Sequence, residues 1–269
     1  MASFDDAIAV RQIAENRWVG DIPEGWRIGA VPNGGLVLAL AGSVLRQALP
    51  HPDPLTMHIL YLAPTELGPV ECEVEILRCG GSTSFATLSL FQHDEIKVQV
   101  SASFSELERL SGENWSTLER PQCTPIEEIA VTGEHGIELR RSVDMHYASG
   151  GEVFKRGEPD GSGCFNGYMK FSDGRDPDVL SLLLFADAMA PPVFTVFGAL
   201  HWVPTVDLSV QIRRHPAPGP IQACFRSRHM SAGIVEEDGE LWDSQGNLVA
   251  LSRGTSKVRI QKRYDETSG

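Results

Sequence analysis

The hydrophobic pattern of the first hundred residues predicts one apolar helix followed by strands. Asn33-Gly34-Gly35 precedes a segment with almost no polar face, Leu36 to Leu45, and Pro50 follows it. Asparagine is a common N-cap and proline cannot continue a helix, so this segment predicts a helix buried on nearly all sides. Apolar and polar residues then alternate over Val70–Cys79 and Ile96–Phe104, which predicts strands with one wet face. Together these elements predict an antiparallel sheet wrapped around a helix.

The second half of the chain repeats this order. Asp176 and Pro177 favour a helix start, with Asp176 as N-cap and proline at the first helical position, and Pro191-Pro192 ends the segment. The predicted strands of this half cover Ile137–Tyr147 and Phe165–Phe171 in part, then Thr205–Arg213, Ile221–Met230, Gly239–Asp243 and Leu248–Ile260.

The two halves also match in sequence. LTMHILYLAPTELGPVECEVEILR, from Leu55, is similar to VDLSVQIRRHPAPGPIQACFRSR, from Val206, and Gly68-Pro69 recurs as Gly219-Pro220 at a spacing of 151 residues. Two copies are too few for a solenoid, so the repeat predicts two related modules with a site where they meet. We expect a first module over residues 1–105, a linker over 106–134, a second module over 135–260 and a tail over 261–269.

Charge narrows the range of partners. The chain has 269 residues, of which 23 are Lys or Arg and 36 are Asp or Glu, for a net charge of −13. This balance argues against nucleic acid or an anionic membrane as a general partner. It leaves room for one phosphorylated ligand on a local basic patch. Such a patch is predicted in the second half, where Arg226 and Arg228 are candidate ligand-binding residues; scattered solubilising charge is the alternative.

Several features bear on compartment and assembly. No apolar run reaches the ~18–20 residues that span a membrane. Acidic residues stand near the N-terminus, where a signal peptide would carry positive charge. The five cysteines are an odd number without close pairing, which favours reduced thiols and a cytosolic location. Phenylalanine and tryptophan residues at positions expected to be exposed give indirect support for a homo-oligomer.

Asp187 is the strongest candidate for chemistry. It is a carboxylate in the second apolar segment, where only Ser181 is otherwise polar. An unpaired carboxylate in an apolar setting is costly, so such a group is paired or used. The alternative is an aspartate that caps a local turn before Pro191.

Four other residues are candidates with structural alternatives. Thr205 opens the strand after the second helix, although a β-branched residue is common in any strand. His58 lies on the corresponding strand of the first half, where a structural role is the alternative. Gly34 and Gly35 start the first helix, and their backbone N–H groups could hold an oxyanion, or the pair could simply allow close packing.

Several common sites are absent from the sequence. There is no Gly-x-Ser-x-Gly elbow, no P-loop and no dinucleotide fingerprint. No histidine or cysteine cluster has metal-ligand spacing. We therefore expect neither a metal nor a cofactor.

The order of motifs resembles the type II acyl-CoA thioesterases. Asn33-Gly34-Gly35, then HILYLAP, VECEVEILRCGGSTSFATLSLFQ and VSASF, resembles the first half of that family. DPDVLSLLLFADAMAPP, HWVPTVDLSV and LWDSQGNLVALSRG resemble the second half. The resemblance runs from about Trp18 to Ile260. It implies an α+β double hotdog, in which two long helices are each wrapped by an antiparallel sheet. It also implies an acyl-CoA-type ligand and self-association.

The resemblance also implies roles for particular residues. In this family an Asp, a Thr and a Gln hold the hydrolytic water. Asp187 and Thr205 match the first two, and Gly254 stands at the Gln position. A glycine has no side chain to hold a water. The expected activity is therefore acyl-CoA hydrolysis, with a non-catalytic acyl-thioester-binding protein as the alternative and a hotdog hydratase or dehydratase ranked third.

Overall fold

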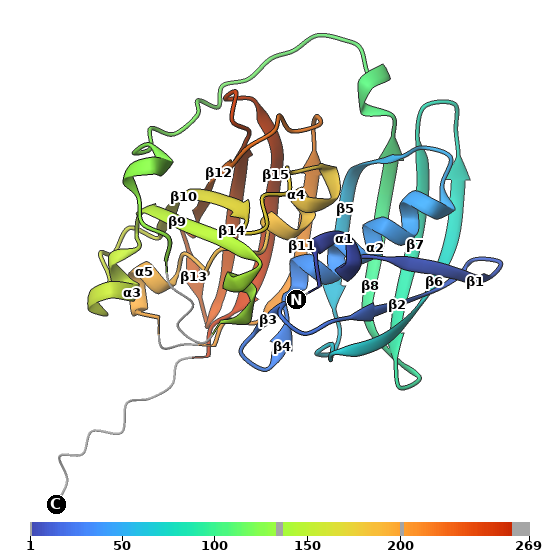
Figure 1. The fold of residues 1–269 in the computed structure, drawn as a ribbon, viewed down its shortest axis with the longest axis horizontal. Coiled ribbons are helices and arrows are strands. Elements are labelled where there is room, and N and C mark those ends of the chain that lie inside the picture. Colours follow the sequence, from blue (N-terminus) through green and yellow to red (C-terminus); the bar gives the residue numbers. More distant parts are fainter. Residues whose placement is uncertain (1, 133–136, 200–201, 260–269) are drawn as a thin grey trace, which may run out of the picture.

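The computed structural model describes residues 2–132, 137–199 and 202–259. A 13-stranded antiparallel sheet dominates the fold, and helices α2 and α4 pack against its inner face (Figure 1). A separate two-stranded ribbon, β3–β4, precedes α2.

In the first half, four long strands follow helix α2 without an intervening helix. Their bounds are α1 Phe4–Ala7, β1 Val10–Ala14, β2 Arg17–Ile22, β3 Arg27–Ile28, β4 Val31–Pro32, α2 Gly34–Ala48, β5 Asp53–Tyr61, β6 Gly68–Cys79, β7 Ser84–Gln92 and β8 Glu95–Ser105. Three 3-10 helices then follow, η1 Leu107–Arg109, η2 Ile126–Glu128 and η3 Glu138–Arg141.

The second half contains shorter helices and a comparable set of strands. Their bounds are β9 Val143–Ser149, α3 Glu152–Arg156, β10 Cys164–Phe171, α4 Val179–Phe185, α5 Phe194–Phe197, β11 Thr205–Ile212, β12 Ile221–Arg226, β13 Met230–Ser231, β14 Ile234–Trp242 and β15 Leu248–Lys257.

Strand order confirms the internal repeat. The sheet runs β1-β2-β6-β7-β8-β5 and then β11-β15-β14-β12-β10-β9, with β13 paired to β14. The second sequence mirrors the first, with α2 before β5 and α4 before β11. Two helix-and-sheet units are therefore joined edge to edge through β5 and β11, as the repeat predicted.

The β5–β11 junction has a local two-fold character. The strands pair antiparallel, with His58 opposite Ser209, and these residues are separated by the repeat spacing of 151. Equivalent positions of the two halves therefore face each other at this point of the sheet. His58 Nδ1 and Ser209 Oγ lie 2.8 Å apart.

The first helix begins and ends as expected, and the second does not. Asn33 caps α2, accepting a hydrogen bond from the Leu36 N–H. In the second half the N-cap is Asp178 instead of Asp176, because Asp178 and Ser181 form a reciprocal capping box. Asp176 accepts a hydrogen bond from the Gly219 N–H. Helix α4 ends at Phe185, so Asp187 lies in the turn after it and not within the helix.

Three strand predictions were imprecise. The segment Ile137–Tyr147 is a 3-10 helix before β9 begins, and Ile221–Met230 divides into β12 and the short β13. Strand β14 starts at Ile234, five positions before the predicted start, so three acidic residues belong to a strand that was expected to begin after them. Between residues 106 and 132 the described chain forms only 3-10 turns and irregular structure, in keeping with a connecting segment. Ile260 and the predicted tail lie outside the described residues.

Close contact between the helices depends on glycine. A Cβ on Gly35 would lie 2.6 Å from the carbonyl oxygen of Leu184 and 2.9 Å from that of Leu183. A Cβ on Gly42 would lie 2.9 Å from side-chain atoms of Leu180 and Leu183. The helices run in opposite directions, so the start of α2 meets the end of α4. We call this meeting point the helix junction.

Candidate active site

Asp187 lies at the helix junction. Its N–H donates to the carbonyl oxygen of Leu184, 3.1 Å away, in a tight turn that ends α4. The turn directs the side chain toward the first turn of α2, where backbone N–H groups have no partner within the helix. Asp187, predicted from the second half of the sequence, therefore lies beside the start of the helix predicted in the first half.

One carboxylate oxygen of Asp187 is well satisfied. Oδ2 accepts from the Gly35 N–H at 2.9 Å and from Asn33 Nδ2 at 3.1 Å. Asn33 Nδ2 also donates to the backbone oxygen of Asp187 at 2.9 Å, while Asn33 Oδ1 accepts from the Leu36 N–H at 3.0 Å. The side-chain oxygen of Asn33 therefore caps α2, while its side-chain nitrogen holds the turn that contains Asp187.

The glycine pair makes this contact possible. A Cβ on Gly34 would stand 3.0 Å from Asp187 Oδ2, and one on Gly35 would stand 3.0 Å from Asp187 Cβ. Side chains at either position would push the carboxylate away from the helix start. Gly34 and Gly35 are thus both at the site. The Gly35 N–H donates to Asp187, however, whereas one interpretation of the sequence is that it donates to an oxyanion.

The other carboxylate oxygen is nearly free. Thr205 Oγ1, at the start of β11, lies 3.5 Å from Asp187 Oδ1, at the outer limit of a hydrogen bond. Asp187 and Thr205 therefore come together as predicted. Oδ1 retains capacity to accept a proton, whereas Oδ2 is held by two donors.

Burial shifts the ionisation of this carboxyl. The pKa of Asp187 is raised to about 6, chiefly because burial penalises the charged form. Hydrogen bonds from Gly35, Thr205, Gly34 and Asn33 act in the opposite direction. A pKa near 6 leaves the group mostly ionised at neutral pH and still able to take up a proton.

Tyr61 is a site residue that the sequence analysis missed. It continues the inward face of β5 after Met57 and Ile59, both fully buried. Its hydroxyl is buried without a hydrogen-bond partner in the described structure, and it lies 2.6 Å from where a Cβ on Gly34 would stand. Burial, and secondarily the charge of Asp187, raise the pKa of Tyr61, so it remains a neutral donor. The period of two in HILYL was the signal that could have found it.

Gly254 lies on the inner face of β15, paired with Leu208 on β11 and with Glu237 on β14. Glu237 was also missed, because the predicted strand began after it. The strand register places Glu237 beside Gly254, the candidate position that has no side chain.

The remaining candidates do not join this cluster. His58 is on the face of β5 opposite to Met57 and Ile59, with Ser209 as its partner. Arg226 pairs with Glu240, and Arg228 pairs with Asp238. Their contacts in the described chain are therefore those of surface ion pairs.

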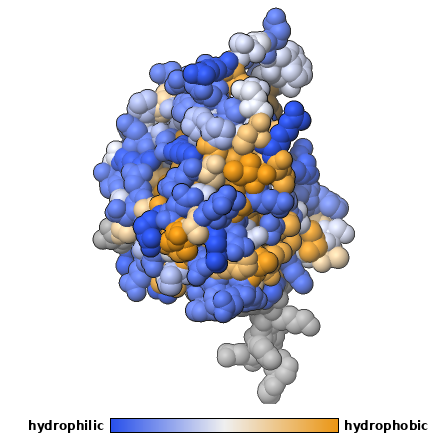
Figure 2. All heavy atoms as spheres, turned by 90° about the vertical axis from the view of Figure 1, so that its right-hand side faces the viewer, coloured by the Kyte–Doolittle hydropathy of each residue, from blue (hydrophilic) through white to orange (hydrophobic). Residues whose placement is uncertain are grey.

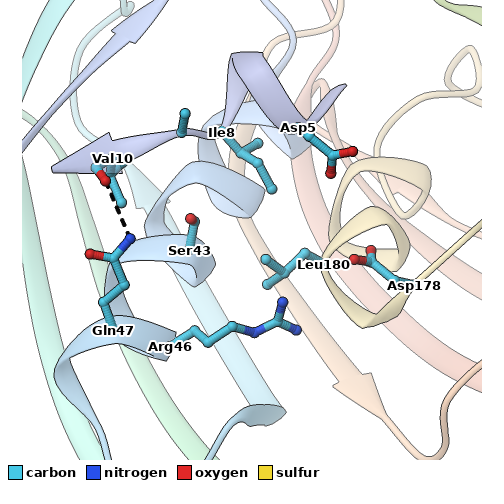
Figure 3. Close-up of a pocket in the computed structure, with 9 residues that line it drawn as sticks. Asp5, Ile8, Val10, Ser43, Arg46, Gln47, Asp178 and Leu180 are labelled. Atoms are coloured by element: carbon cyan, nitrogen blue, oxygen red, sulfur yellow. Dashed lines mark hydrogen bonds between the residues drawn. The ribbon is translucent and has the colours of Figure 1, made fainter. Parts of the chain in front are cut away.

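A pocket of about 320 Å³ lies at the other end of the helix pair. Figure 3 shows the Arg46 side chain, from the last turn of α2, extending toward Leu180 and Asp178 at the start of α4, while Gln47 points to Val10. Gln47 Nε2 donates to the backbone oxygen of Val10 at 3.2 Å. Since Asp187 meets the first turn of α2, this pocket is separated from it by roughly 15 Å of helix.

Within the described residues, no group of three or more His, Cys, Asp or Glu side chains is arranged to hold a metal ion. No helix of the described chain is long and apolar enough to cross a membrane. The five cysteines are all free thiols.

The fold and the site define a double-hotdog protein whose helix junction carries a carboxylate beside a strand hydroxyl. The chain belongs to the acyl-CoA thioesterase family. Residues 22–105 match the acyl-CoA thioesterase N-terminal domain, and residues 120–256 match the acyl-CoA thioesterase C-terminal domain. The resemblance seen in the sequence is thereby confirmed.

Individual relatives agree with this family. An uncharacterized protein of Mycobacterium tuberculosis H37Rv is 25% identical, over 97% of this chain and 99% of its own. A solved structure from Thermobifida fusca YX, described as a candidate thioesterase II, superposes with a TM-score of 0.88 at 25% identity, over 97% and 98% of the chains. A hot dog fold protein of unknown function from Alicyclobacillus acidocaldarius has a TM-score of 0.85 at 20% identity, over 96% and 98%.

Proposed function

We propose that this protein hydrolyses an acyl-CoA thioester to a free acid and coenzyme A, using a water held by Asp187 and Thr205. The observation that carries the proposal is the asymmetry of the Asp187 carboxylate. Oδ2 accepts from the Gly35 N–H and from Asn33 Nδ2 at 2.9 and 3.1 Å, whereas the contact of Oδ1 with Thr205 Oγ1 is longer, at 3.5 Å. A carboxylate held by one oxygen and open at the other is suited to accept a proton from water.

The reaction balances without any added group. Water oxygen attacks the thioester carbonyl carbon while Asp187 Oδ1 takes one water proton. The tetrahedral intermediate then collapses, the carbon–sulfur bond breaks and the thiolate leaves. The proton on Asp187 is finally released to the thiolate or to solvent, and this restores the base. A thiolate is a good leaving group, so the chain needs no covalent nucleophile for this step.

Tyr61 supplies the donor for the oxyanion in this proposal. The Gly35 N–H is already hydrogen-bonded to Asp187, and the Gly34 N–H also interacts with that carboxylate. The Tyr61 hydroxyl is an unpartnered buried donor, and it and Asp187 Oδ2 both lie within 3.0 Å of the Cβ position of Gly34. Tyr61→Phe removes the hydroxyl alone. It should lower kcat by roughly 100-fold, the usual cost of one oxyanion donor.

The experiment that tests the function is free-thiol release from a panel of acyl-CoA esters of differing chain length. Turnover of at least one ester supports hydrolysis and identifies the preferred acyl group. No release from any ester would contradict it.

The rival function is binding without catalysis, and Gly254 is the observation that favours it. At the position where the resemblance implies a glutamine, this chain has no side chain. Acyl-CoA binding without thiol release would support the rival.

A further inference from the structure

Glu237 projects into the site from a neighbouring strand. It pairs with Gly254 on β15, which in turn pairs with Leu208 on β11. Side chains at directly paired positions of antiparallel strands emerge on the same face. Leu208 is buried against the core, so this face is the inner one. The glutamate is therefore next to the site position that lacks a side chain.

The alternation along β14 agrees with this placement. Val235, Gly239 and Leu241 are buried and share the period of two with Glu237. Glu237 itself is partly buried. A carboxyl between buried neighbours on the inner face is not one of the solvated charges of the surface.

Gly254 leaves a path from Glu237 toward β11. Neighbouring strands lie about 4.8 Å apart, so a glutamate side chain on β14 can extend over the adjacent position 254 on β15. A Cβ on Gly254 would already stand 3.1 Å from the backbone oxygen of Asp207 and 3.4 Å from Leu208 Cδ1. Position 254 is therefore crowded for a side chain of its own, and its inner-face neighbour on β14 is Glu237.

Two titratable groups from other parts of the fold face Glu237. Asp187, in the turn after α4, and Tyr147, on β9, both interact with it electrostatically. The Tyr147 hydroxyl accepts a hydrogen bond from the Ala190 N–H at 3.1 Å, which holds the Asp187 turn against β9. Asp238, the next residue on β14, points the other way and pairs with Arg228 and Arg253.

The carboxyl of Glu237 has no ion-pair partner among the described residues. In the parts of the chain that the structure describes, it makes no ion pair and no hydrogen bond. Burial, then Asp187 and Asp238, raise the pKa of Glu237 well above its usual range. A carboxyl that is partly shielded from solvent and has no partner favours its neutral form.

We propose that Glu237 is the third polar group that contacts the attacking water, extending beside Gly254 from the adjacent strand. A neutral carboxyl offers one donor and one acceptor, as a carboxamide does. It can therefore do from β14 what a glutamine would do from position 254. This inference rests on the proposed function, since it adds a residue to the same water site.

Asp187 and Glu237 then have different roles, one as the ionised base and the other as the protonated acid. Asp187 ionises first because it accepts N–H groups from Gly35 and Asn33, which favour its charged form. Glu237 has no such donors and keeps its proton beside the charged Asp187. Two neighbouring carboxyls whose environments separate their pKa values are a common arrangement for a base and an acid in one site.

Kinetic variants of Glu237 test this role. Glu237→Ala should lower kcat/KM roughly 100-fold, the typical cost of a mispositioned reactant. Glu237→Gln keeps shape, donor and acceptor, so it should retain most of the turnover. The unmodified enzyme should lose activity at alkaline pH as Glu237 ionises, and Glu237→Gln should remove that loss. The matched control is Glu236→Ala, on the opposite face of the same strand and paired with Thr255.

Unchanged kinetics in a folded Glu237→Ala variant would overturn the proposal. So would a Glu237→Gln variant as inactive as Glu237→Ala, because the neutral form would then not be the working one. An equal loss in Glu236→Ala would point to damage of the strand in general and would also count against it.

A second measurement does not depend on turnover. The carboxyl carbon resonances of the ¹³C-labelled full-length protein, followed against pH, should show Asp187 responding to two ionisations, its own and that of Glu237. Glu237→Gln should leave a single step. If Asp187 titrates identically in both proteins, the two carboxyls do not share a site. Absence of thiol release from the unmodified protein would refute the proposed function, and this titration would still decide the place of Glu237.

Discussion

At the scale of single residues, the pH dependence of Asp187 is the most direct test of the site. A base must be ionised, and its pKa is about 6, so kcat/KM should fall as pH decreases through about 6. Asp187→Asn keeps the shape but removes the basic oxygen, and should lower turnover ~100- to 10,000-fold at every pH.

Thr205→Val should lower turnover less than Asp187→Asn does. It deletes one hydroxyl beside Oδ1 and leaves the base, so its loss should be smaller. Stopped assays over pH 5 to 9, with circular dichroism to verify folding, measure both. A folded Asp187→Asn variant with unchanged rate would refute the role of Asp187.

The ionised carboxylate of Asp187 should also lower the free energy of unfolding. Its folded pKa of about 6 lies above the ordinary aspartate value of 3.8, so between about pH 4 and pH 6 the folded protein binds more protons than the unfolded chain. Stability contributed by this group is therefore lost as pH rises through that window. Asp187→Asn cannot ionise and should be more stable than the unmodified protein by about 1–3 kcal/mol at pH 8, and by less at pH 5. Urea unfolding at the two pH values measures this difference, and an equal difference at both would contradict it.

At the scale of elements, the approach of α2 to α4 should be intolerant of a side chain at Gly35. A Cβ there would lie 2.6 Å and 2.9 Å from two backbone oxygens, which cannot move as a side-chain end can. Gly35→Ala should destabilise the fold by about 1–3 kcal/mol and lower activity, because the Gly35 N–H would move away from Asp187. Gly81→Ala is the control, since a Cβ there meets nothing within 4 Å. Chemical denaturation compares the two, and an equal response would show that the contact is unimportant.

The elements also mark the limit of prediction from local patterns. The apolar run after Asn33 correctly predicted α2, whose cap depends on residues three positions apart. The second helix was predicted too long at both ends, because Asp178 is its N-cap in place of Asp176 and Ala186 is its C-cap. Strand β14 was predicted too late, because a run of three acids resembles a turn when its pairing partners are unknown.

At the scale of the whole molecule, self-association remains a prediction. Figure 2 shows apolar patches among polar residues on the side that carries β1, β6 and β7. Ile76 and Leu77 of β6 and Phe85 of β7 are exposed. Exposed apolar residues that lie near one another often mark an interface. We expect at least a dimer, with a mass twice 29.4 kDa by light scattering. Leu77→Asp combined with Phe85→Asp should shift it toward monomer. A monomeric unmodified protein would contradict the prediction.

The sequence by itself determined the architecture and half of the candidate site. The 151-residue repeat, the two apolar helices and the alternating strands were sufficient for two joined modules, because burial follows local periodicity. Asp187 and Thr205 were found because a carboxylate is conspicuous in an apolar segment and because the order of motifs resembles a known family. Tertiary structure alone decided that the Gly35 N–H donates to Asp187, that the Tyr61 hydroxyl is left without a partner, and that Glu237 stands beside Gly254. Those facts depend on strand register and helix packing between distant segments, and no local pattern of residues specifies which distant side chains will meet.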